Sequence, residues 1–111
     1  MSRRIIQNEP FIHLLARSRP KRRKSLLKQA TREELTSLFE ICLNILKGNM
    51  PLNQTEYQRL KKHRNIIRKL ANKRLSFKRK KVIVNQKGGF LGTLASIAIP
   101  VLGSLLAGAR R

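Results

Sequence analysis

The chain has 111 residues, of which 26 are Lys or Arg and only 5 are acidic, giving a formal net charge of +21. Self-repulsion of this size opposes compaction unless a polyanion neutralises it, and nucleic acid and anionic lipid headgroups are the obvious polyanions. One cysteine excludes a disulfide framework within the chain, and Ile5-Ile6 is too short an apolar stretch for a signal peptide. We therefore expect one small domain made and used inside the cell, with no metal and no cofactor.

Two prolines predict the starts of two short helices. Pro10 suits a first helical turn, and the apolar residues after it predict a helix that ends near Arg17 to Arg19, before Pro20. Pro20 in turn begins a helix that reaches Ala30. The first turn of this second helix is Lys-Arg-Arg-Lys, which opposes the helix dipole. That arrangement indicates that an outside anion neutralises the turn, or that the helix frays.

Capping boxes predict the two central helices. Thr31-Arg-Glu-Glu34 begins a helix whose apolar residues recur at spacings of three and four, and Gly48 supplies its end. Asn53-Gln-Thr-Glu56 begins a second helix to about Asn72, with one apolar stripe and a cationic remainder. The stripe consists of Tyr57, Leu60, Ile67, Leu70 and Ala71.

The chain changes character after this helix. Ser76 is the predicted cap of a helix through Val82-Ile-Val84, although those β-branched residues fit a strand equally well. Gly88-Gly89 then breaks the preceding element, and Phe90 to Ala109 runs for twenty residues without a charge. We expect this last segment to be a helix that is interrupted or kinked near Pro100.

These elements predict an all-α protein, namely a small bundle of four to five short helices plus a separate apolar C-terminal helix. The expected organisation is a helical domain over residues 1–72 and a basic linker or short helix over 73–87. A Gly-Gly hinge or cleavage site follows at 88–89, and a hydrophobic tail covers 90–111.

The basic stretch from Arg59 to Lys87 is the candidate nucleic-acid interface, because it holds thirteen Lys or Arg and no acid. Contacts to about six to ten phosphates would lower affinity by roughly a thousandfold or more between about 50 and 200 mM salt. Tyr57 and Phe77 are the only aromatic residues in the basic half, which does not indicate a stacking platform for single strands. A solvated cationic face without a partner is the alternative. The residues expected to contact phosphate are Arg22, Arg23, Lys24, Lys61, Lys62, Arg64, Arg68, Lys69, Lys73, Arg74, Lys78, Arg79, Lys80 and Lys81.

The uncharged tail is the candidate membrane segment. Twenty uncharged residues are about the length needed to cross a hydrocarbon core of roughly 30 Å. Spanning, surface insertion, self-association and burial in a soluble core are the four alternatives. The apolar residues expected to contact a membrane are Phe90, Leu91, Leu94, Ile97, Ile99, Val101, Leu102, Leu105 and Leu106.

Catalytic chemistry has little support in this sequence, so we do not expect an enzyme and assign no catalytic residue. The chain has no Asp, and Cys42 lies on the apolar stripe of its predicted helix. His13 and His63 stand on helices without a paired carboxylate or thiol in the pattern. For His63 we expect a place at the margin of the core or a phosphate contact, in preference to metal ligation.

The last third of the chain resembles the precursor of the adenovirus core peptide mu. The shared order is a basic segment, then Lys87-Gly-Gly-Phe90, then a tail rich in Leu, Ile, Ala, Gly and Pro. The resemblance implies a DNA-condensing segment and a tail that a virus-coded cysteine protease removes by cleavage between Gly89 and Phe90. Gln86 departs from this pattern, because the family has Met, Ile or Leu two residues before the Gly-Gly pair. A plain flexible hinge at Gly88-Gly89 is therefore the alternative.

Most of the chain is similar to small basic proteins of adintoviruses and related Polinton (Maverick) elements. The shared features are a Leu-rich helical N-terminal part, a turn like Gly48-Asn-Met-Pro-Leu52, a Lys-rich stretch and an ending like Val84-Asn-Gln-Lys-Gly-Gly-Phe-Leu91. This resemblance implies a protein of a virus-like element.

The residues and the resemblance together predict a virion core protein that binds and condenses double-stranded DNA without sequence preference. The expected locations are the virion and the host nucleus, and Pro20-Lys-Arg-Arg-Lys24 matches short clusters read by nuclear import receptors. The expected partners are nucleic acid, a membrane or the capsid interior, and the virus-coded protease. The alternatives are a tail-anchored membrane protein with a cationic cytoplasmic domain, and a small RNA-binding protein.

Overall fold

A computed structural model describes the backbone of residues 3–109 and the side chains of residues 3–103. Within that part of the chain, helices are joined by short connections and no strand is present, so the predicted all-α class is confirmed. The helices are α1 (Arg3–Gln7), α2 (Glu9–Arg17), α3 (Pro20–Gln29), α4 (Arg32–Leu46), α5 (Gln54–Lys61), α6 (Arg64–Ala71), α7 (Phe77–Gln86) and α8 (Gly88–Ala109).

Both predicted capping boxes are present. The Glu34 backbone N–H donates to Thr31 Oγ1 over 3.1 Å, and the Glu34 carboxylate accepts from the Thr31 N–H over 2.9 Å. Asn53 and Glu56 make the same reciprocal pair at the start of α5. Gly48 has a φ of +72°, the left-handed conformation that glycine adopts without strain, and it ends the turn after α4.

The helix predicted after Ser76 is also confirmed. The Ser76 side chain accepts a hydrogen bond from the Arg79 N–H at the start of α7, and the β-branched run Val82-Ile-Val84 is helical. Tertiary packing decides between helix and strand here, because Val84 is fully buried and Val82 is exposed. That arrangement puts one β-branched side chain on each side of the helix.

Two elements differ from the prediction. The helix expected to run to Asn72 is divided into α5 and α6 at Lys62 and His63, where the His63 N–H bonds to the Leu60 carbonyl three residues back. This tighter turn places the His63 ring 5.0 Å from the ring of Phe90 on α8. The predicted interruption near Pro100 is absent, because α8 continues past it.

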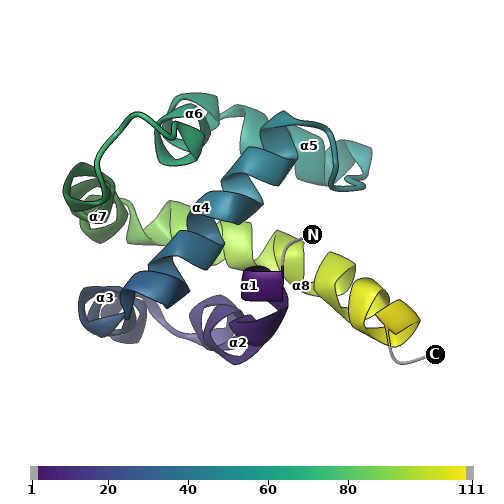
Figure 1. Ribbon diagram of the computed structural model, residues 1–111, viewed down its shortest axis with the longest axis horizontal. Coiled ribbons are helices and arrows are strands. Elements are labelled where there is room, and N and C mark those ends of the chain that lie inside the picture. Colours follow the sequence, from purple (N-terminus) through teal and green to yellow (C-terminus); the bar gives the residue numbers. More distant parts are fainter. Residues whose placement is uncertain (1–2, 110–111) are drawn as a thin grey trace.

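The helices are arranged around α4 and α8 (Figure 1). Figure 1 shows α4 crossing in front of α8, with α5 and α6 on one side of this crossing and α2 and α3 on the other. Helix α6 packs on α4, and α8 packs mainly along α2 with further contacts to α3 and α7. The C-terminal helix is thereby enclosed by segments from the first third of the chain.

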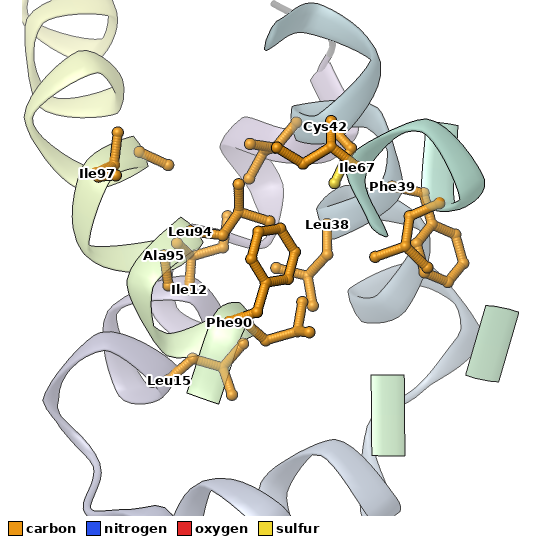
Figure 2. Close-up of a cluster of buried hydrophobic side chains, with 14 of the residues drawn as sticks. Ile12, Leu15, Leu38, Phe39, Cys42, Ile67, Phe90, Leu94, Ala95 and Ile97 are labelled. Carbon is orange, nitrogen blue, oxygen red and sulfur yellow. The ribbon is translucent and has the colours of Figure 1, made fainter. Parts of the chain in front are cut away.

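The core is one cluster to which each helix from α1 to α8 contributes at least one buried side chain. Figure 2 shows how the side chains of α8 meet those of α2 and α4, with Phe90 at the centre of the view. The labelled side chains are Ile12 and Leu15 of α2, Leu38, Phe39 and Cys42 of α4, Ile67 of α6, and Phe90, Leu94, Ala95 and Ile97 of α8.

We predicted that the apolar C-terminal helix stays separate from the bundle. This prediction is wrong, because α8 forms part of the core. Phe90, Leu91, Leu94 and Leu102 are at most 5 % exposed. The other helices are short and carry many cations, so each offers only a narrow apolar stripe, whereas an all-round apolar helix can be enclosed from several sides. The radius of gyration, 13.0 Å, agrees with about 13 Å for a compact domain of this size.

Among the described residues, only a bent pair of helices has the length and composition of a membrane span. No single helix there combines the length and apolarity that crossing a bilayer needs, whereas α7 and Gly88–Gly103 together do, with 95° between them.

Candidate nucleic-acid interface

Three of the five Glu carboxylates contact basic side chains of α1 and α2. The guanidinium of Arg4 binds Glu33 over 2.7 Å and Glu40 over 2.5 Å, which ties α1 to α4. The carboxylate of Glu9 lies 3.0 Å from Nε2 of His13, one turn further along α2. These acids therefore stabilise the N-terminal half of the fold.

The remaining two carboxylates belong to the capping boxes. Glu34 accepts from the backbone of Thr31, and Glu56 accepts from the backbone of Asn53. Every acid in the chain thus has a partner, and none of these partners comes from the basic stretch Arg59 to Lys87. These bonds therefore leave the positive charge of that stretch without compensation by the five Glu side chains.

Most of the cations predicted to contact phosphate are exposed on α5, α6, α7 and the connections between them. They lie on helices that follow one another along the chain, and the exposed pair on α3 lies on a helix that contacts α7. The exposed members of the predicted set are Arg22, Lys24, Lys61, Lys62, Arg64, Arg68, Lys69, Lys73, Arg74, Lys78 and Arg79.

Lys80 differs from its neighbours because it points into the fold. It is only 8 % exposed, and its Nζ atom lies 5.1 Å from the centre of the Phe39 ring. Phe39 makes an edge contact with Phe77, and the guanidinium of Arg32 lies 4.5 Å from the centre of the Phe77 ring. This alternation of cations and rings fastens α7 to α4. Burial lowers the pKa of Lys80, and the side chain has a structural place here.

Arg23 is the second inward-facing cation of the predicted set. Its guanidinium donates to the carbonyl oxygens of Leu15 over 3.3 Å and Ser18 over 2.7 Å, at the C-terminal end of α2. These bonds satisfy carbonyls that have no partner within their own helix. Lys81 is half-buried. With Arg23 and Lys80 also turned inward, eleven of the fourteen predicted residues are exposed.

Arg17 and Arg19 are exposed arginines outside the predicted set. Arg17 and Arg19 line a shallow hollow with Arg22, Ser18 and Leu14 at the junction of α2 and α3. The signal was present in the sequence, since Arg17-Ser-Arg-Pro-Lys-Arg22 has four cations in six residues. The turn between two helices brings these side chains to one place, next to the start of α3.

The predicted cleavage site lies at the start of α8. Gly89 is exposed and Gly88 is half-buried, and neither adopts a positive φ, so the hinge does not use the backbone freedom of glycine. Phe90 is 5 % exposed because it packs on His63 and in the core. The bond between Gly89 and Phe90 therefore joins an accessible residue to a buried one, inside the first turn of a helix.

The residues predicted to contact a membrane are mostly core residues here. Phe90, Leu91, Leu94, Ile97 and Leu102 are buried, whereas Ile99 and Val101 are half-buried. Leu105 and Leu106 lie outside the residues whose side chains are described. Contact of this helix face with lipid would require α8 to leave its place on α2.

Cys42 and the acidic residues offer no reactive site in the described part of the chain. Burial raises the pKa of the Cys42 thiol to about 12, with a smaller opposing effect from Lys80, so the sulfur carries its proton at neutral pH. No group of three His, Cys, Asp or Glu side chains among the described residues could hold a metal ion.

Comparison of the chain with protein-family models, with curated proteins and with solved structures found no match.

Proposed function

We propose that the protein binds double-stranded nucleic acid through phosphate contacts, without reading its sequence. One observation carries this proposal: all five Glu side chains have partners within the fold, while the stretch Arg59 to Lys87, from the end of α5 through α6 and α7, is rich in exposed cations and contains no acid. Such a separation of charge favours a polyanionic partner.

The net charge of the protein is close to the charge of a duplex segment as long as the protein itself. Its longest dimension is 38 Å, and a stretch of duplex of that length carries about 22 phosphates. The formal net charge of the chain is +21. One molecule on each such stretch would therefore neutralise it almost completely, as a condensing protein must.

The aromatic residues favour a duplex over a single strand. Phe77 packs between Phe39 and Arg32, so it does not offer a free face for a base. Tyr57 is exposed, but one ring is not a stacking platform. The surface therefore offers phosphate contacts and no base-specific pattern.

We further propose that this activity serves a virion core protein of a virus-like element, present in the virion and the host nucleus. The support is the resemblance to the mu precursor and to the basic proteins of Polinton elements, together with the exposure of Gly89. Mass spectrometry of the protein from its native particle tests the proteolytic step. A chain ending at Gly89 supports release of the tail, and an intact chain throughout the particle contradicts it.

Titration of the purified full chain with labelled duplexes tests the binding proposal. Two unrelated duplexes of equal length should bind with equal affinity, and affinity should fall by roughly a thousandfold or more between about 50 and 200 mM salt. Duplex RNA and single-stranded DNA serve as the comparison arms. Binding that persists unchanged at about 0.5 M salt would falsify the proposal, because phosphate contacts are lost as counterions accumulate.

A further inference from the structure

A groove lies between the end of α4, the following connection and helices α5 and α6. Its volume is about 280 Å³. Its lining combines apolar side chains, here called the apolar wall, with three cations, here called the cationic rim. The apolar wall consists of Ile45, Leu46, Leu52, Tyr57, Leu60 and Ile67, and the cationic rim consists of Lys61, Arg64 and Arg68. No acidic side chain lines it.

The apolar wall is more exposed than the helical pattern predicts. Tyr57 belongs to the predicted packing stripe of its helix, yet it is 55 % exposed, and Leu46 is 47 % exposed. The described chain has four such large exposed hydrophobic side chains, and two of them adjoin this one groove. Clustered apolar exposure beside polar residues is typical of an interaction site.

The cationic rim determines the chemistry of the partner. Lys61, Arg64 and Arg68 are exposed, and none of them takes part in the bonds given for the five Glu carboxylates in the described part of the chain. A second copy of this chain matches the rim poorly, because each of its five Glu side chains is already engaged by a partner in its own fold. The complementary partner must bring both apolar side chains and free carboxylates.

We propose that this groove binds an acidic amphipathic helix of a partner protein. Apolar side chains at spacings of three and four residues would contact Leu46, Leu52 and Tyr57, and carboxylates beside them would pair with the rim. The volume is near the lower end of ligand sites, which suits a few anchoring side chains. The site goes beyond the proposed function, but it shares Lys61, Arg64 and Arg68 with the phosphate surface. Partner and duplex therefore exclude each other at this end of the molecule.

Fluorescence anisotropy on the full chain tests this site with a labelled synthetic helix of about 18 residues that carries one Leu stripe flanked by Glu. A peptide of identical composition with the stripe permuted measures attraction by charge alone. We expect the striped peptide to bind at least tenfold more tightly. The double variant Leu46→Ser, Tyr57→Ser should remove this difference, whereas Val82→Ser, an equally exposed apolar position on α7, should keep it.

Duplex binding measured on the same variants separates this site from the proposed function. Leu46→Ser with Tyr57→Ser should leave duplex affinity unchanged, and the striped peptide should compete with duplex on the unaltered chain. Equal affinity for the two peptides, or loss of the difference in Val82→Ser, would overturn the groove and leave nucleic-acid binding standing. Loss of duplex affinity in the apolar variant would show that nucleic acid occupies the groove and would also overturn the proposal. Circular dichroism confirms that each variant is folded.

Discussion

The guanidinium of Arg23 lies directly over Gly92, where a Cβ atom would come within 2.4 Å of the Arg23 Cζ atom. Arg23 belongs to α3 and Gly92 to α8, and the same guanidinium donates to the end of α2. The absence of a side chain at one position of α8 thus allows a single cation to hold three helices together. Gly92 is required for this contact and not for an unusual backbone conformation.

The substitution Gly92→Ala should destabilise the fold. The new methyl group would displace the Arg23 guanidinium from its two carbonyl partners, which costs about 1.5–3 kcal/mol per charged hydrogen bond. The gain in helix propensity returns only about 1 kcal/mol. We expect a net loss of about 2 kcal/mol, measured by urea unfolding.

A double-mutant cycle supplies the control for this contact. In an Arg23→Ala background, Gly92→Ala should instead stabilise by about 0.5–1 kcal/mol, because only the helix-propensity gain remains. Gly103→Ala, on the same helix with no atom within 4 Å of its added methyl group, should stabilise to the same extent in both backgrounds. Independent effects of Arg23 and Gly92 would contradict the contact.

Neighbouring lysines on α7 should behave in opposite ways. Lys78→Ala removes an exposed cation, so it should reduce the salt slope of duplex binding by about one and leave stability unchanged. Lys80→Ala removes the cation beside Phe39, so it should lower stability and leave the slope unchanged. Salt titrations and thermal melts of both variants check this, and equal slopes for the two variants would contradict the inward placement of Lys80.

A chain that ends at Gly89 should fail to fold cooperatively. It lacks the buried side chains of Phe90, Leu91, Leu94, Ile97 and Leu102, each of which contributes about 1.5–3 kcal/mol. Their sum approaches the whole stability of a typical domain, about 5–15 kcal/mol. Calorimetry should show no cooperative transition for the truncated chain in the absence of nucleic acid. A sharp transition with full helix content would show that α8 is dispensable for the core.

The Cys42 thiol should be protected in the native state and should make stability depend on alkaline pH. Its pKa is raised from 9.0 to about 12 by burial, so the unfolded thiol ionises first. The unfolded state then binds fewer protons than the folded state, and stability should fall as pH rises between these two values. Urea unfolding across this range, compared with Cys42→Ala, should show a shallower decline in the variant. A thiol reagent at about pH 8 should react only after unfolding.

Local sequence signals predicted most helices because they act within a few residues. The capping boxes at Thr31 and Asn53, the stop at Gly48 and the cap at Ser76 each bond to backbone one turn away. The break at His63 was not predicted in this way, and the His63 ring there contacts Phe90, which is 27 residues further along the chain.

The candidate interface was partly predictable for the same reason. Composition identifies a cationic stretch, and eleven of the fourteen residues chosen from it are exposed. It does not distinguish Lys78 from Lys80, because the difference lies in which side of α7 meets Phe39 on α4. Arg17 and Arg19 join the cationic surface only through the turn between α2 and α3.

The sequence by itself determined the all-α class, the positions of the capped helices and the separation of positive charge from the few carboxylates, because these depend on neighbours within one turn or on composition alone. Only the tertiary structure decided where the uncharged segment lies. An apolar helix of this length is equally suited to lipid and to a protein interior, since both exclude water. Whether the narrow apolar stripes of α2, α3, α4 and α7 enclose it depends on contacts between distant parts of the chain.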